Sequence, residues 1–267
     1  MKAAQLFIFL FIGFATVTAQ FTPDLVGFQY SEFDKYKKLK VKQQVETVYD
    51  YIFTEEYVVN SITDYSETGQ IMQTILNPEL NSEEALDTIK YIYVYTNEGN
   101  IQSVTIHGVD ILPIVYGFFY DKKGNLIESN IASAEARRIN FTLDKKGRVL
   151  KAASKGAMFE YDEEGNASDE PVWIVLEETT YEWNENGLLV DERGYYRSEF
   201  SYHAIYKYDE KGSLVEENFC YDPQFPDTPS TTIQFEYDEN GLLKKRSITN
   251  PDSEEKYVSL FEYAYYK

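Results

Sequence analysis

The chain has 267 residues, with 45 acidic against 25 basic side chains and a formal net charge of −20. So acidic a surface repels nucleic acid and anionic membranes, and we expect neither a nucleic-acid partner nor membrane insertion. The single cysteine, Cys220, excludes an internal disulfide framework, so stability must come from buried side chains and sheet hydrogen bonds.

The first residues of the chain have the pattern of a secretory signal. Lys2 supplies a positive charge, residues 6–14 form a short apolar run, and Val17-Thr18-Ala19 is a small-residue cleavage site. The run is too short to cross a bilayer as a helix. We therefore expect residues 1–19 to be a signal peptide, and the protein to be exported to the periplasm, the cell surface or the medium. Loss of Lys2 leaves 24 basic residues, so the mature charge is 24 − 45 = −21.

Residues 20–40 read as an irregular leader, with one helical turn expected over residues 31–38. Its lysines belong to the one basic cluster of the sequence: Lys35, Lys37, Lys38, Lys40 and Lys42. We expect them to lie on a solvated edge strand and to discourage edge pairing, with contact to an acidic partner as the alternative. The first strand is predicted over 41–53, and residues 77–90 resemble a capped short helix.

From residue 41 to residue 267 the chain reads as a single repeat domain of about eight hairpins. Each copy has an aromatic strand, a four-residue turn that ends in glycine, and a return strand. The turn glycines are Gly69, Gly99, Gly124, Gly147, Gly165, Gly187, Gly212 and Gly241. In most copies Asp or Asn opens the turn, as a type I turn favours, and glycine suits the left-handed position that follows. Replacing Gly241 with valine should therefore destabilise the protein.

The alternation inside each copy predicts one apolar and one polar face. Aromatic residues stand two apart before the turn, as in Phe235 and Tyr237, and therefore share a face. A hairpin with one apolar face cannot bury it alone. We therefore predict an all-β fold, an antiparallel meander of these hairpins that forms a long twisted or curled sheet. The sequence leaves open whether the sheet stays open, forms a spiral or closes into an irregular barrel.

Three copies, at residues 120–126, 208–214 and 237–243, follow the pattern Tyr-Asp-x-x-Gly-x-Leu. In these residues the chain resembles the YD-repeat, or Rhs-like, family, and the likeness extends loosely from Val41 to the C-terminus. The resemblance implies hairpin architecture. Large members wrap their repeats into a β-spiral shell around a toxin or serve as surface adhesion modules, whereas this chain looks more like the small exported repeat proteins of bacteria.

Reactive chemistry is sparse in the sequence. A calcium loop starting at Asp162 or Asp238 would need a bidentate Glu at its twelfth position, which holds Trp173 or Thr249 instead, so we expect no metal and no cofactor. His203 is expected to be an outward-facing strand residue, and Cys220 a strand residue half covered by its neighbours. Neither completes a nucleophilic triad, and we expect no catalytic residues.

Aromatic side chains are the remaining candidates for ligand contact. Those that gather around the sixth and seventh copies are Trp173, Trp183, Tyr195, Tyr196, Tyr202 and Tyr206. Cross-strand packing is their favoured use, and stacking on a sugar or small ligand is the alternative.

The sequence therefore predicts a non-enzymatic exported repeat protein, acting as an interaction or structural module at the cell envelope. Its partner would be a protein or a glycan, and the acidic surface suits a basic or cation-decorated one. The alternatives are a carbohydrate- or small-ligand-binding protein and, third, a glycosidase that uses a pair of its many acids.

Overall fold

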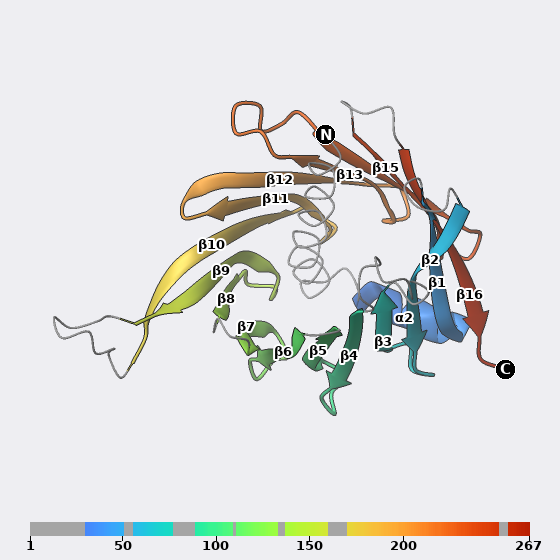
Figure 1. Cartoon of the computed structure of the whole chain (residues 1–267), viewed down its shortest axis with the longest axis horizontal. Helices are drawn as coiled ribbons and strands as arrows, with labels where there is room; N and C mark the ends of the chain where they lie inside the picture. The colour runs from blue at the N-terminus through green and yellow to red at the C-terminus, as the bar shows by residue number, and fades with distance from the viewer. Residues whose placement is uncertain are drawn as a thin grey trace.

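In the computed structural model, the described residues are 30–50, 56–76, 89–108, 111–132, 137–159, 170–250 and 256–267. Their strands form one antiparallel sheet in chain order, and the sheet closes because its first strand pairs with its last (Figure 1). Within these ranges, no helix has the length and apolarity to cross a bilayer. The predicted signal peptide, the leader up to residue 29, the insert at 77–88 and the fifth turn lie outside the described residues.

The elements of the described chain are one helix and sixteen strands. They are α2 Tyr30–Leu39, β1 Val41–Asp50, β2 Glu56–Tyr65, β3 Ile71–Leu76, β4 Ile89–Tyr95, β5 Ile101–Gly108, β6 Ile111–Tyr120, β7 Leu126–Ala132, β8 Arg137–Leu143, β9 Val149–Met158, β10 Val172–Trp183, β11 Leu189–Tyr196, β12 Glu199–Tyr208, β13 Leu214–Cys220, β14 Thr231–Tyr237, β15 Leu243–Thr249 and β16 Lys256–Tyr265.

The hairpin turns have the geometry that the sequence predicts. In the β14–β15 turn, Asp238 Oδ1 accepts hydrogen bonds from the backbone N–H groups of Asn240 and Leu242, both at 2.8 Å. Gly241 has a φ of 78° and donates its N–H to the Asp238 carbonyl at 3.0 Å. The ladder register shifts beside the turn, between Glu236 and Tyr237, which is the expected bulge. The Asp and Gly of the motif are therefore fully used by the turn.

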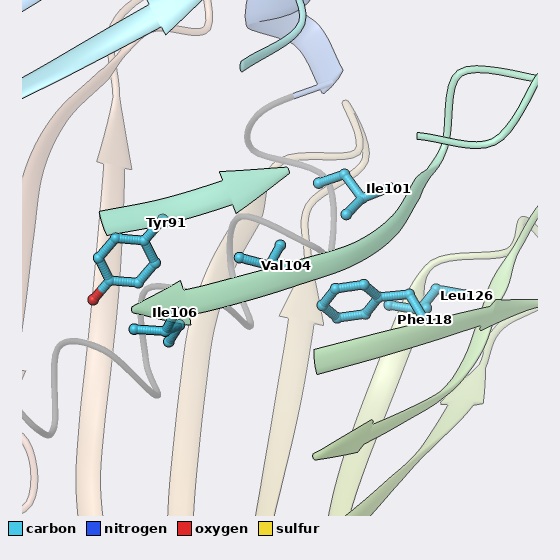
Figure 2. Packing of buried hydrophobic residues seen from close by; sticks show 6 residues of the cluster. All are labelled: Tyr91, Ile101, Val104, Ile106, Phe118 and Leu126. Carbon is cyan, nitrogen blue, oxygen red and sulfur yellow. The ribbon is translucent and has the colours of Figure 1, made fainter. Parts of the chain in front are cut away.

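Alternation sorts the side chains onto two faces of the sheet. Tyr91 pairs with Ile106 and Tyr93 with Val104, so these apolar side chains share one face. Figure 2 shows part of this face, where Tyr91, Ile101, Val104, Ile106, Phe118 and Leu126 form a buried cluster on β4 to β7. The polar alternate positions are the more exposed ones, so we take them as the outer side of the ring and the aromatic face as its inner side. A second buried cluster continues along β9 to β12, and a third joins α2 to β1, β2 and β3.

The ring closes through contacts between segments some 200 residues apart. β1 pairs with β16 with a register shift between Val41 and Gln43, and Val45 stands opposite Glu262. The C-terminal Tyr266 donates its backbone N–H to the Lys40 carbonyl at 2.8 Å, and its hydroxyl to the Tyr65 carbonyl at 2.6 Å. Lys35 of α2 donates to the Gly241 carbonyl at 2.9 Å. The all-β meander is therefore confirmed, and of the three predicted forms the irregular barrel is the one found.

Closure also shows that the predicted edge strand of lysines was wrong. Lys35, Lys37 and Lys38 lie on α2, Lys40 follows it, and Lys42 belongs to β1. Because β1 is paired with β2 on one side and β16 on the other, it is not an edge. The helical turn predicted over 31–38 is confirmed as part of α2.

Candidate functional site

One end of the ring carries the tight turns, and a ladder of side-chain hydrogen bonds runs along it. In four of the described hairpins, the aromatic residue directly before the turn donates to the backbone carbonyl two residues past the glycine of the preceding tight turn. The pairs are Tyr95 to Ile71 at 2.9 Å, Tyr120 to Ile101 at 2.8 Å, Trp183 to Val149 at 2.7 Å and Tyr237 to Leu214 at 2.8 Å. Tyr263 of β16 continues the ladder to the Leu243 carbonyl at 2.8 Å.

This ladder explains why the motif has tyrosine, rather than phenylalanine, before its turn. The ring packs on the inner face and the hydroxyl satisfies a main-chain group of the adjacent hairpin. Sequence reasoning predicted the packing but missed the bond. The available signal was position, since Tyr95, Tyr120 and Tyr237 each stand directly before a turn.

A buried carboxyl group stands on the inner face of β11. Glu192 is 1% exposed and accepts hydrogen bonds from the hydroxyls of Tyr202 at 2.5 Å and Tyr206 at 2.8 Å. Burial raises the pKa of Glu192, and the two hydroxyl donors only partly offset it. The Tyr202 ring lies against Gly194, where an added Cβ would come within 2.1 Å of it. Sequence reasoning did not single out Glu192, because nothing in its local pattern distinguishes it from the many other acids.

A second buried carboxyl group lies beside the seam of the ring. Glu46 of β1 accepts from Arg246 of β15 at 2.5 Å, and from Asn60 at 3.0 Å and Ser61 at 3.1 Å. Burial raises the pKa of Glu46, but the Arg246 charge, together with hydrogen bonds from Ser259 and its other donors, leaves that pKa below its ordinary value. The pair therefore links β1 to β15 across β16 in the ionised form.

The outer face carries a third polar cluster, centred on His203. Its Nε2 lies 2.5 Å from Asp191 Oδ2, and its Nδ1 lies 2.9 Å from the Pro226 carbonyl and 3.2 Å from Asp227 Oδ1. His203 is on the outer side, as predicted, but it is 2% exposed because the β13–β14 connection lies over it. Cys220, expected to be half covered, is 0% exposed.

The six aromatic candidates serve different contacts. Trp183 is part of the turn-end ladder, and Tyr202 and Tyr206 are bound to Glu192. The Arg138 guanidinium lies 4.7 Å from the Trp173 ring.

The two remaining candidates are neighbours on β11. Tyr195 is half-buried, and Tyr196 is 46% exposed with Arg197 5.4 Å from its ring. The structure therefore does not bring the six side chains together on one surface.

Metal-ligand groupings were sought in the same described ranges. There, no three or more His, Cys, Asp and Glu side chains stand together in an arrangement that fits a metal ion. The Asp162 loop lies outside those ranges. Asp238, the other calcium candidate, uses its carboxylate within the turn.

The chain is similar in sequence pattern or in fold to several known proteins. A protein-family model described as Teneurin YD-shell matches residues 26–225. The fold is similar to the crystal structure of a porin-like protein from Bacteroides uniformis ATCC 8492, with 9% identity, a TM-score of 0.52, and coverage of 84% of this chain and 97% of that one.

Two further solved structures are similar at lower scores. A porin-like protein from Bacteroides vulgatus ATCC 8482 has 11% identity and a TM-score of 0.44, covering 85% of this chain and 98% of that chain. TcdB2-TccC3 without its hypervariable C-terminal region has 17% identity and a TM-score of 0.26, and the match covers 76% of this chain but 12% of that much longer one. No curated protein matches the sequence.

The family match spans most of the chain and includes six of the seven described tight turns. It confirms the YD-repeat resemblance and identifies the protein as a shell-like structural repeat module. The chain belongs to the Teneurin YD-shell family.

Proposed function

We propose that this chain is a non-enzymatic exported protein that serves as a closed structural or interaction module at the cell envelope. The family supports a shell-like repeat module. The apolar run at residues 6–14 and the cleavage site at Ala19 support export. The partner would be a protein or a glycan that carries positive charge, because the mature chain is strongly acidic.

The observation that carries this proposal is that the recurring residues of the repeat make contacts within the sheet itself. In each described turn that opens with Asp or Asn, the opening side chain accepts hydrogen bonds from its own turn, and the glycine supplies the left-handed backbone. The pre-turn tyrosines donate to a backbone carbonyl of the preceding hairpin. The recurring side chains thus build the wall, which is what a structural module requires.

Export is tested by comparing the full chain with a variant that lacks residues 1–19, each carrying the same C-terminal epitope, in fractionated bacterial cells. The full chain should leave the cytoplasm and begin at Gln20 by mass spectrometry, whereas the truncated chain should stay in the cytoplasm. An uncleaved full chain in the cytoplasm would contradict the proposal. A cytoplasmic marker enzyme, assayed in every fraction, is the control for cell lysis.

The absence of catalysis is tested on the purified chain with a panel of glycoside and ester substrates. Glu192 is the sharpest candidate acid, because burial raises the pKa of its carboxyl group. Turnover that Glu192→Gln abolishes, with the melting temperature preserved, would overturn the non-enzymatic proposal. Equal background rates in both proteins are expected.

A glycan- or small-ligand-binding role for Trp173, Trp183, Tyr195, Tyr196, Tyr202 and Tyr206 stays a prediction. The geometry gives it less support, since Tyr206 is buried, the Tyr202 hydroxyl is bound to Glu192, and Trp183 is held in the ladder. A glycan array and intrinsic fluorescence titration would test it. Binding that Tyr196→Ala weakens at least tenfold would favour the ligand-binding alternative over the purely structural one.

A further inference from the structure

The β13–β14 connection, residues 221–230, folds back over the outer face of the ring. Inside the connection, Phe225 N–H donates to the Asp222 carbonyl at 3.1 Å, and Thr228 N–H to the Phe225 carbonyl at 3.0 Å, so it has two tight turns of its own. Its C-terminal end is tied to the sheet by Ser230 N–H, which donates to the Phe219 carbonyl at 2.7 Å. Between these points, its middle meets the barrel at His203 through Pro226 and Asp227.

Among the described residues, the hydrogen-bond neighbours of the His203 ring nitrogens are acceptors. Asp191 faces Nε2, while the Pro226 carbonyl and the Asp227 carboxylate face Nδ1. A neutral imidazole carries one N–H and one lone pair, so it satisfies one side and turns a lone pair toward an acceptor on the other. The imidazolium donates on both sides. The geometry therefore fits the protonated ring.

The charges around the ring are balanced in that state. From β11, Asp191 also accepts from the Arg193 side chain at 3.0 Å, and Arg193 is the register partner of His203. From the connection comes Asp227, and from β13 comes Cys220, which stands opposite His203 in the register. Two cations then meet two carboxylates, and loss of the imidazolium charge leaves an excess of negative charge.

Cys220 is covered at the same place. It is 0% exposed on the outer side of β13, and the connection begins at the next residue. Burial, followed by the Asp227 charge, raises the pKa of its thiol. Cys220 and His203 are register partners on the same side of the sheet, and the connection that follows Cys220 lies over that side at His203.

We infer that His203 is a protonation-dependent latch, which holds residues 221–230 against the outer wall over Cys220 when the ring is charged and releases them when it is neutral. Imidazoles change charge between about pH 5 and pH 8. The segment should therefore be closed in mild acid and open more often as the pH rises. Release exposes the Cys220 thiol and frees the connection to move.

The protein carries its own probe and its own control for this latch. Cys220 is its one cysteine, and His107 is its one other histidine, exposed on β5. The assay measures the rate of methanethiosulfonate labelling of Cys220 in the native chain at pH 5.5 to 8. At each pH, this rate is divided by the rate for the chain unfolded in guanidinium, because thiol reactivity itself depends on pH. The ratio reports how often the segment opens.

In the wild type and in His107→Gln, we expect the ratio to rise about tenfold or more between pH 5.5 and pH 8, since a charge-assisted hydrogen bond is lost. In His203→Gln it should be high and independent of pH. A flat ratio in the wild type, or a pH-dependent rise that survives in His203→Gln, would overturn the latch.

A second measurement tests the latch in the wild type, in case His203→Gln fails to fold. The wild type has two imidazole Cε1–H signals by NMR, one from each histidine, and His107→Gln assigns them by removing one. The midpoint at which the His203 signal titrates should coincide with the midpoint of the labelling ratio. Midpoints that differ by more than one pH unit would show that another group controls the segment.

Discussion

Gly187 offers the cleanest test of the turn chemistry that builds the wall. Its φ is +82°, and a Cβ built on it would meet no atom within 4 Å, so a substitution there changes the backbone strain without causing a clash. A side chain held in the left-handed region costs about 1–3 kcal/mol, and a β-branched side chain lies at the upper end of that range. We therefore expect Gly187→Val to lower the free energy of unfolding by about 2 kcal/mol.

The measurement is thermal unfolding followed by circular dichroism. For a chain of this size, each 1 kcal/mol lowers the melting temperature by about 2–4 °C, so the valine variant should melt about 4–8 °C below the wild type. Gly187→Asn is the matched control, because Asn enters the left-handed region far more readily, and it should lose less than half as much. Equal melting temperatures for the wild type and the valine variant would refute the turn reasoning. So would equal losses for valine and asparagine.

Three further predictions concern the ladder and the seam. Tyr237→Phe removes the donor to the Leu214 carbonyl and should cost about 1 kcal/mol in urea unfolding, with an unchanged m-value. Leu143 is the apolar residue at a ladder position, so the free energy of unfolding of Leu143→Tyr should exceed that of Leu143→Phe by up to about 1 kcal/mol. Equal free energies for the two variants would argue against a regular ladder. Because Arg246 and its other donors lower the pKa of Glu46 below the ordinary 4.5, the stability from Glu46 is present above pH 4.5 and is lost as the pH falls through the lowered value. Melting curves from pH 7 to pH 3 should show this loss, and Glu46→Gln should remove it.

The hairpins could be predicted from the sequence because their determinants are local. Asp238 and Gly241 stand three residues apart and fix the turn between them, whatever the rest of the chain does. The aromatic face follows from a spacing of two along a strand. Both features repeat, so each copy supports the interpretation of the others.

Closure of the ring could not be predicted, because it depends on groups far apart in the chain. Glu46 and Arg246 are 200 positions apart, and neither lies in a sequence motif from which the other could be predicted as its partner. The lysines near the start of the sheet were assigned to an edge strand for the same reason. An edge is a property of the whole sheet, and β1 loses its edge only because β16 returns to it.

The polar clusters also could not be predicted from local sequence patterns. His203 occupies an outer position by alternation, and only the fold-back of residues 221–230 buries it. Glu192 stands at an inner position, where two tyrosine hydroxyls from β12 make its burial tolerable. In both cases the side chain is placed by the strand but its environment is set by a neighbouring element.

The seam between β1 and β16 tests the closed ring most directly. In a Cys220→Ala background, Val45→Cys with Glu262→Cys should form an intramolecular disulfide under mild oxidation, because the two positions are register partners. The pair Lys245→Cys with Leu260→Cys, between β15 and β16, is the control, since it joins consecutive strands in any form of the sheet. The account predicts that both pairs cross-link in the monomer, independently of protein concentration. Cross-linking of the control pair alone would show that the sheet is an open spiral and would contradict the closed ring.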